Sequence, residues 1–178
     1  VLAITGPRQS GKTTLARYQF GDKPYVSLED PVERVFANED PRGFLARFTQ
    51  GAVFDEAQRW PDLFSHLQGM VDADRRPGRF ILTGWQQFGL LAGVTQSLAG
   101  RVGMTRLLPL AATEIPAIAD RQLSLDGAML KGGYPALHTQ PVEPADWFAS
   151  YIATYVERDV RQVLNIQNLP AFQRFLRL

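Results

Sequence analysis

A short segment near the start of the sequence has the residue types and spacing of a phosphate-binding loop. The pattern G-x-x-x-x-G-K-[ST] is met at every defined position by Gly6, Pro7, Arg8, Gln9, Ser10, Gly11, Lys12 and Thr13. The glycines let the main chain approach an anion without a Cβ in the way. Lys12 can reach the β- and γ-phosphate oxygens of a nucleoside triphosphate, and the Thr13 hydroxyl is a ligand for Mg²⁺. We therefore expect the residues from Gly6 to Thr14 to bind ATP together with Mg²⁺.

Two adjacent carboxylates follow an apolar run further along the chain. The run Ala52–Phe54 is typical of a buried strand, and Asp55 and Glu56 come directly after it. Behind a phosphate-binding loop, one carboxylate holds Mg²⁺ and a second activates the attacking water as a general base. A solvated acidic turn is the alternative, and the complete loop upstream favours the catalytic interpretation. We expect Asp55 to hold the metal and Glu56 to act as the base.

Two further polar residues lie at the ends of strand-like segments. Thr83 closes the apolar run Phe80–Thr83, where it either senses the γ-phosphate or simply caps the strand. The sensing role requires this strand to lie between the first and third strands. Arg101 precedes the fifth strand-like run, where a single surface arginine is usually just solvated. A second function for this arginine stays open at this point.

A parallel sheet covered by helices would bring these residues to one site. Short apolar runs alternate with helical patterns, which indicates an α/β fold. The expected strands are Val1–Thr5, Tyr25–Leu28, Ala52–Phe54, Phe80–Thr83 and Val102–Leu108. The expected helices between them are Lys12–Phe20, Pro61–Asp72 and Gln86–Leu98. Because a helix follows the glycine-rich loop, the unpaired N–H groups of its first turn would face the bound phosphates.

After Pro109 the pattern changes to helices only. We expect a core of residues 1–109 and a helical region of residues 110–178 that follows it. The helices expected in the second region are Ala111–Ala119, Leu123–Leu130 and Pro144–Ile166.

Composition places the chain among ordinary globular proteins. Of its 178 residues, 45% are apolar and 21% charged, which suits one main domain with a core. The 19 Lys and Arg residues nearly balance the 18 Asp and Glu residues, so charge does not support nucleic-acid binding. Cysteine is absent, which excludes thiolate metal sites, and no run of about 18 apolar residues exists. A cytoplasmic location without membrane contact is the default expectation.

The sequence resembles the prokaryotic AAA-superfamily ATPases that carry a C-terminal domain of unknown function. The likeness covers nearly the whole chain. It rests on the segments ITGPRQSGKTTLAR, YVSLEDPVERVFANEDPRGFL, FDEAQRWPDLF, PGRFILTG, SLAGRV and LLPL, and further on GGYPAL and YIATYVERDV.

The resemblance implies an AAA-like core with sheet order 5-1-4-3-2 and ATP hydrolysis coupled to an unidentified partner. It also implies assembly of identical subunits, in which Arg101 of one subunit would meet the nucleotide of the next. Residues 110–178 would then lead into a truncated C-terminal domain. The catalytic set expected from motif and resemblance together is Lys12, Glu56, Thr83 and Arg101.

Two other functions stay open, one because of a departure from the family and one because a different class of enzyme shares the phosphate-binding loop. The family usually has LTGS where this chain has Leu82-Thr83-Gly84-Trp85, so a bulky indole replaces a small polar side chain and turnover could be slow. An ATP-binding switch with little hydrolysis is therefore one alternative. A small-molecule kinase is the other, and the adjacent acidic pair favours hydrolysis over it, because such kinases usually lack that pair.

Overall fold

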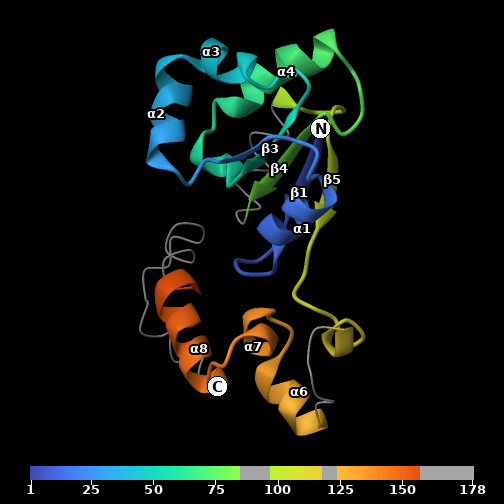
Figure 1. Ribbon diagram of the computed structural model, residues 1–178, viewed down its shortest axis with the longest axis vertical. Coiled ribbons are helices and arrows are strands. Elements are labelled where there is room, and N and C mark those ends of the chain that lie inside the picture. The colour runs from blue at the N-terminus through green and yellow to red at the C-terminus, as the bar shows by residue number, and fades with distance from the viewer. Residues whose placement is uncertain (85–96, 118–123, 157–178) are drawn as a thin grey trace. The chain divides into compact units, whose positions relative to one another are not determined.

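The computed structural model describes residues 1–84, 97–117 and 124–156, and its contacts divide the chain into Val1–Pro109 and Leu110–Leu178. The first unit is an α/β fold around a five-stranded parallel sheet of order β2-β3-β4-β1-β5 (Figure 1). The strands are β1 (Leu2–Thr5), β2 (Tyr25–Ser27), β3 (Ala52–Asp55), β4 (Phe80–Gly84) and β5 (Gly103–Arg106). Read from the other side, this is the order 5-1-4-3-2, so the predicted fold class is confirmed.

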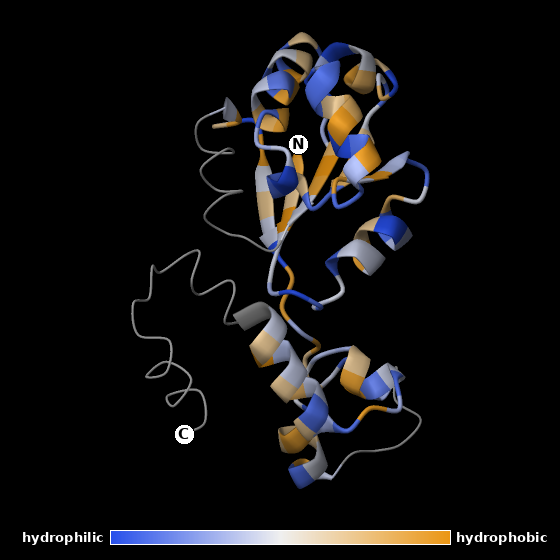
Figure 2. Ribbon diagram, turned by 90° about the vertical axis from the view of Figure 1, so that its left-hand side faces the viewer, coloured by the Kyte–Doolittle hydropathy of each residue, from blue (hydrophilic) through white to orange (hydrophobic). Residues whose placement is uncertain are grey.

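Apolar side chains fill both faces of this sheet. Successive residues of a strand point to opposite faces, so Val53 and Phe54 of β3 enter different clusters. Helix α1 (Lys12–Gln19) covers the smaller cluster through Ala16. The larger cluster holds most of the buried aromatic rings and lies under the helices that follow β2 and β3. The central strands accordingly appear largely hydrophobic when the ribbon is coloured by hydropathy (Figure 2).

Two helices between β2 and β3 were not predicted from the sequence. Helix α2 (Pro31–Glu39) begins after Asp30, whose side chain accepts a hydrogen bond from Val32 N. Helix α3 (Pro41–Ala46) begins in the same way, with Asp40 accepting from Gly43 N. Each helix thus starts with an aspartate cap followed by proline, a pair of residues that favours a helix start. The 3₁₀ turn η1 (Ala57–Arg59) and helix α4 (Leu63–Ala73) then lead to β4, and α4 lies where Pro61–Asp72 was predicted.

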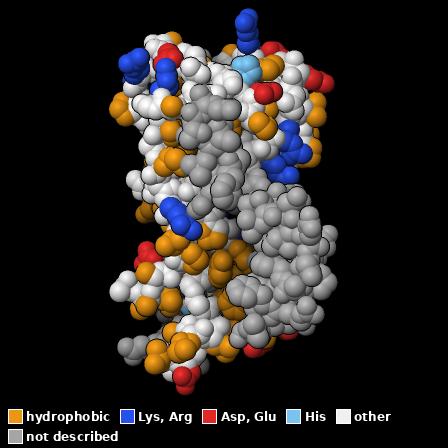
Figure 3. All heavy atoms as spheres, turned by 180° about the vertical axis from the view of Figure 1, so that it is seen from behind, with side chains coloured by type: hydrophobic (Ala, Val, Ile, Leu, Met, Phe, Trp, Pro, Cys, Tyr) orange, Lys and Arg blue, Asp and Glu red, His pale blue; other side chains and the backbone are white. Residues whose placement is uncertain are grey.

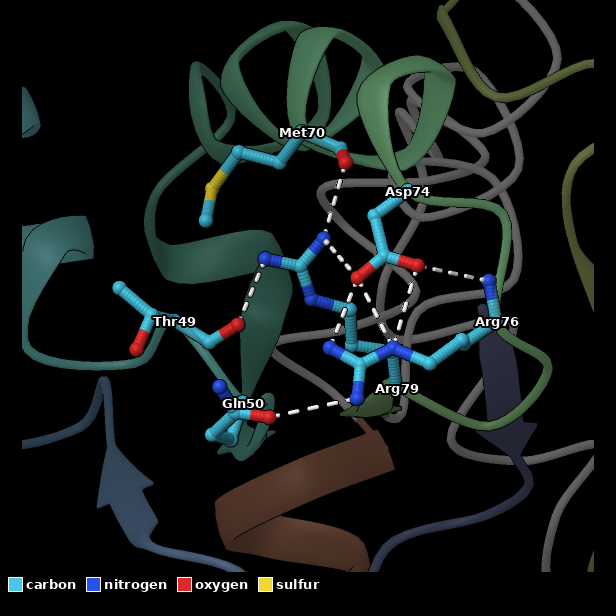
Figure 4. A network of polar contacts seen from close by, with 6 residues as sticks. All are labelled: Thr49, Gln50, Met70, Asp74, Arg76 and Arg79. Carbon is cyan, nitrogen blue, oxygen red and sulfur yellow. Dashed lines mark hydrogen bonds and ion pairs between the residues drawn. The ribbon is translucent and has the colours of Figure 1, made fainter.

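The buried Arg79, just before β4, forms hydrogen bonds and an ion pair with residues of two other segments (Figure 4). Its guanidinium donates to the carbonyl oxygens of Met70 at 2.9 Å and Thr49 at 2.8 Å, and it lies 3.5 Å from the Asp74 carboxylate. Arg76 pairs with the same carboxylate at 2.7 Å. This network joins the end of α4, the loop before β3 and the start of β4 at the edge of the sheet where the strands begin.

The regular elements in the described part of the second unit are all helical, and turns connect them. It contains η2 (Ile115–Ala117), α6 (Leu125–Lys131), α7 (Ala136–Thr139), α8 (Pro144–Tyr151) and the π-helical turn η3 (Ile152–Val156). Aromatic rings from α8 and the segment before α7 pack together, with Trp147 and Tyr151 stacked at 5.0 Å and Tyr134 against both. Apolar side chains gather on the described surface of this unit (Figure 3).

Several predicted elements differ in extent from the observed ones. The α-helix predicted over Ala111–Ala119 is wrong in its described part, which forms turns and the short η2. Pro116 has no N–H to donate to the carbonyl oxygen of Ala112, so the α-helical hydrogen-bond pattern is interrupted there. The predicted strand Val102–Leu108 is shorter, as β5. Most of the predicted helix Gln86–Leu98, and the end of Pro144–Ile166, lie outside the described residues.

No helix within residues 1–84, 97–117 and 124–156 has the length and apolar character needed to cross a membrane.

Candidate functional site

The loop between β1 and α1 is shaped to surround an anion. Gly6 has φ 150° and Gly11 has φ 93°, backbone conformations that glycine adopts far more readily than other residues. A Cβ at Gly6 would overlap the carbonyl oxygen of Leu107, so this position has no room for a side chain. Gly11 directly precedes the first turn of α1, whose unpaired N–H groups face the loop at the carboxyl-terminal edge of the sheet.

Lys12 lies inside this loop with its ammonium group folded over the main chain. Its Nζ donates to the carbonyl oxygens of Gly6 at 3.1 Å and Pro7 at 2.6 Å, and the residue is only 6% exposed. Burial lowers the pKa of this ammonium, while the negative charges of Glu56 and Asp55 oppose the shift. The amino group of Lys12 thus lies within the loop that the sequence predicts to bind phosphates.

Asp55 and Thr13, which are distant in sequence, meet at the end of β3. The Thr13 hydroxyl donates to the Asp55 carboxylate, with Oγ1 at 2.9 Å from Oδ2 and 3.2 Å from Oδ1. Thr83, at the end of the neighbouring β4 and fully buried, donates to Oδ1 of the same carboxylate. A hydroxyl and a carboxylate are the oxygen ligands that Mg²⁺ prefers, so this donor set fits the ion that the sequence predicts.

A third hydroxyl on Asp55 comes from a residue that the sequence analysis missed. The phenol of Tyr25, on β2, donates to Asp55 Oδ2 at 2.6 Å. The pKa of Tyr25 is raised by burial first, and then by its hydrogen bond to Asp55 and by the charge of that carboxylate. Tyr25 opens the run YVS, where an aromatic residue is most simply explained as a strand former. Only the pairing of β2 with β3 reveals its contact.

Glu56 adopts an unusual backbone conformation directly after the strand. Its φ of 56° and ψ of 46° lie in the left-handed region, which is rare for a residue with a side chain. Its N–H donates to Thr83 Oγ1 at 3.3 Å, and its carboxylate accepts a hydrogen bond from the Gln58 amide. Burial raises the pKa of Glu56, the Gln58 hydrogen bond opposes that shift, and the charge of Asp55 reinforces it. Gln58 was not predicted from the sequence.

The remaining loop residues differ in their exposure. Ser10 is buried, and its Oγ has no hydrogen-bond partner within the described part of the chain. Such an orphaned hydroxyl in a phosphate-binding loop suits a ligand oxygen. Arg8 is half-buried, Gln9 is exposed with φ 58°, and Thr14 is exposed on the first turn of α1.

Arg101 lies at the opposite edge of the sheet from this site. Its carbonyl oxygen accepts a hydrogen bond from the amino group of Val1, at the start of β1, whereas the phosphate-binding loop follows the end of that strand. Its guanidinium pairs with the Asp72 carboxylate through Nε at 2.7 Å and Nη2 at 3.0 Å. The structure therefore does not bring Arg101 to the other predicted site residues of the same chain. Trp85 lies outside the described residues.

Comparison with known proteins gives matches along most of the chain. The sequence pattern of a family described as an AAA domain matches residues 1–116, and that of a domain of unknown function matches residues 122–178. An uncharacterized protein of Mycobacterium bovis is 36% identical over 167 residues, which is 92% of this chain and 36% of that protein. An uncharacterized protein of Mycobacterium tuberculosis matches with the same identity and coverage. The chain thus spans about a third of the length of these curated relatives.

Proposed function

Because the chain belongs to the AAA domain family, we propose that it binds ATP and hydrolyses it in the presence of Mg²⁺. Family membership supports nucleotide binding, and the proposal of hydrolysis rests on the residues of the site. The observation that carries it is the contact of 2.9 Å between the Thr13 hydroxyl, from the phosphate-binding loop, and the Asp55 carboxylate, from β3. This contact joins the two halves of a magnesium and triphosphate site, with the buried Lys12 in the same loop.

Each residue of the site has a role in the proposed reaction. The loop N–H groups and Lys12 bind the phosphates, and Thr13 and Asp55 would hold Mg²⁺, directly and through water respectively. Bound Mg²⁺ neutralises negative charge on the phosphate oxygens. Glu56 takes a proton from the attacking water, and its raised pKa brings it nearer to that of an efficient base at neutral pH.

Thr83 links the two acidic residues within this arrangement. It contacts both the Asp55 carboxylate and the Glu56 N–H. It therefore fixes the position of the proposed metal ligand relative to the proposed base, near the point where a γ-phosphate would lie. We assign it this positioning role together with the sensing role expected from the sequence.

The proposal extends to the organisation of the whole protein. Residues 1–109 are the ATPase core, and residues 110–178 begin a C-terminal domain whose coupling partner, protein or nucleic acid, is not identified. Arg101 cannot serve the nucleotide of its own chain from the opposite edge of the sheet. We propose that it serves the nucleotide of a neighbouring identical subunit, where its planar charge would stabilise the developing charge on the phosphate.

The test of hydrolysis is phosphate release from ATP by the full-length protein and by its Glu56→Gln variant. Glutamine keeps the shape of the side chain and cannot take a proton, so binding should persist while turnover falls roughly a hundredfold or more. Glu39→Gln, at an exposed position near the end of α2, is the matched control and should keep full turnover. Asp55→Asn should instead weaken Mg²⁺-dependent binding.

The same assay separates the alternatives. ATP binding without phosphate release from the wild-type protein would identify an ATP-dependent switch. Phosphoryl transfer to an added acceptor in place of release to water would identify a kinase. Normal turnover by Glu56→Gln would remove Glu56 from the proposed role.

A further inference from the structure

The Asp55 carboxylate accepts hydrogen bonds from three hydroxyl groups. One of the three donors lies outside the loop and the strand ends that make up the proposed site. Thr13 and Thr83 belong to elements whose role follows from the phosphate-binding loop and the neighbouring strand. Tyr25 belongs to β2, the edge strand beside β3. Its phenol makes the shortest hydrogen bond to Asp55 Oδ2, at 2.6 Å compared with 2.9 Å for Thr13.

The strand register explains why Tyr25 reaches this carboxylate. Ser27 pairs with Asp55 across the two strands, and Tyr25 pairs with Val53. Tyr25 therefore lies on the same face as Asp55, diagonally two positions away, which a long aromatic side chain spans. The Arg17 guanidinium, from α1, lies over the Tyr25 ring at 4.6 Å from its centroid. The phenol is thus held between β3 and the helix that follows the phosphate-binding loop.

The three donors together fix the direction of the carboxylate. A carboxylate has about four lone-pair sites for hydrogen bonds or metal ions. Tyr25 and Thr13 share Oδ2, and Thr83 and Thr13 share Oδ1. Without the phenol, Oδ2 would keep only its bond from Thr13, and the carboxylate could rotate away from the loop. A residue that orients a metal ligand without touching the metal is commonly worth about 10–100-fold in metal affinity.

We propose that Tyr25 is a positioning residue of the magnesium site, whose hydroxyl holds the Asp55 carboxylate in the orientation in which it faces Thr13. This inference rests on the proposed ATP and Mg²⁺ site and adds a residue from a third strand to it. It assigns a role in the site to β2, whose Val26 also packs in the larger hydrophobic cluster.

The test is the Mg²⁺ dependence of ATP binding by full-length Tyr25→Phe, measured with a fluorescent ATP analogue without reliance on turnover. Phenylalanine keeps the ring and its contact with Arg17 and removes only the hydroxyl. We expect the Mg²⁺ concentration at half-maximal effect to rise about 10–100-fold. Nucleotide affinity in excess chelator should stay unchanged, because the loop and Lys12 are untouched. Mn²⁺ binding followed by electron paramagnetic resonance should weaken in parallel.

Tyr18→Phe is the matched control, because Tyr18 is 85% exposed on α1 and loses the same hydroxyl. It should keep the wild-type Mg²⁺ dependence. If wild type and this control show Mg²⁺-dependent ATP binding and Tyr25→Phe has an unchanged or lower midpoint, the positioning role is overturned and the proposed function stands. If wild type binds no nucleotide with Mg²⁺, the proposed function and this inference fall together.

A double-mutant cycle distinguishes positioning from general loss of stability. In an Asp55→Asn background the phenol has no carboxylate to orient, so Tyr25→Phe should add little to the Mg²⁺ midpoint. A full, additive loss in that background would mean that Tyr25 acts through the fold and not through Asp55, which would overturn the proposal.

Discussion

Charged side chains have different partners at the two ends of the strands of the central sheet, which we call its two edges. At the edge where the strands begin, guanidinium groups meet carboxylates: Arg76 and Arg79 contact Asp74, and Arg101 contacts Asp72. At the edge where the strands end, the exposed Arg59 pairs with Glu29 at 3.4 Å, but the buried charges of Lys12 and Asp55 are held by neutral groups. Lys12 donates to loop carbonyls, and Asp55 accepts from hydroxyls. The guanidinium and carboxylate groups where the strands begin already neutralise each other, whereas the charges of Lys12 and Asp55 stay available to a ligand.

The direction of the chain explains this difference. In a parallel α/β sheet the strand ends lead into helix amino termini, whose N–H groups attract anions, and ligands bind at that edge. The opposite edge receives helix carboxyl termini and the starts of strands, where ion pairs and carbonyl contacts join the elements. The sheet thus separates a chemical edge from a structural edge, and the predictions below test that separation.

The largest expected effect is at the chemical edge, in Lys12→Ala. This change removes the buried charge that we propose binds the phosphates, so we expect ATP binding to be lost. Thermal shift provides the measurement, because ATP at about a hundredfold above its dissociation constant should stabilise the intact protein by roughly 2.7 kcal/mol. Lys23→Ala is the control, since Lys23 precedes β2 at the opposite edge and should leave the shift intact. A full ATP-induced shift in Lys12→Ala would contradict the assignment of the loop.

Arg101→Ala is the change that can break the comparison, because a residue of the structural edge is proposed to act on a neighbour's nucleotide. We expect turnover of the assembled protein to fall roughly a thousandfold or more if this arginine stabilises the transition state. ATP binding by each subunit should persist, since the loop of the same chain is intact. The measurement is steady-state phosphate release under conditions where full-length subunits associate.

Mixing two inactive variants distinguishes action on a neighbour from a role within one chain. Arg101→Ala and Lys12→Ala subunits, when combined, form some interfaces with one intact loop and one intact arginine. Recovered turnover in the mixture would support action between subunits. If the variants demonstrably assemble and no turnover returns, Arg101 is a structural residue and the separation of the two edges holds for it as well.

Arg79→Met should affect stability and leave chemistry unchanged. Arg79 is buried, and its loss leaves the carbonyl oxygens of Met70 and Thr49 without these partners, which costs about 1–3 kcal/mol. Urea unfolding measures the loss, and ATP affinity should be unaffected in folded protein. Arg76→Met is the control, because Arg76 is 57% exposed and its pair with Asp74 is screened by water, so the loss of stability should be much smaller. Equal losses for both variants would contradict the importance of burial.

Most residues of the candidate site, at the chemical edge, could be predicted from the sequence because they stand in contiguous motifs. Gly6 to Thr13 and the pair Asp55 and Glu56 follow strands directly, so the strand order was enough to expect them together. Tyr25 and Gln58 could not be found in this way. The Tyr25 contact depends on the register between β2 and β3, and the Gln58 contact forms beside the left-handed turn at Glu56. The catalytic roles of all these residues stay predictions.

The fold shows a similar division between local and non-local information. The sheet order was expected from the family resemblance, since alternation of strands and helices alone does not specify it. The helices α2 and α3 were missed although Asp30-Pro31 and Asp40-Pro41 are local start signals, because they interrupt what looked like a single connection between two strands. The helix expected at Ala111–Ala119 failed for a local reason, the proline at position 116.

The smallest expected effect concerns Asp72, which holds Arg101 at the structural edge. The hydrogen bonds and charge of Arg101 lower the pKa of Asp72, yet both side chains are about one-third exposed, at 32% for Arg101 and 37% for Asp72. Asp72→Asn keeps the shape and removes the charge, so we expect the free energy of unfolding to change little, because water screens an exposed ion pair. If Arg101 serves a neighbouring subunit, its own Asp72 competes with the neighbour's phosphates for the guanidinium. Turnover of the assembled Asp72→Asn protein should then equal or exceed that of the wild type, and the difference should shrink at high salt because screening weakens the competing pair.

Urea unfolding and phosphate release at two salt concentrations provide both measurements. A loss of turnover as large as that in Arg101→Ala would mean that the pair works as a unit, with Asp72 orienting the arginine and not competing for it.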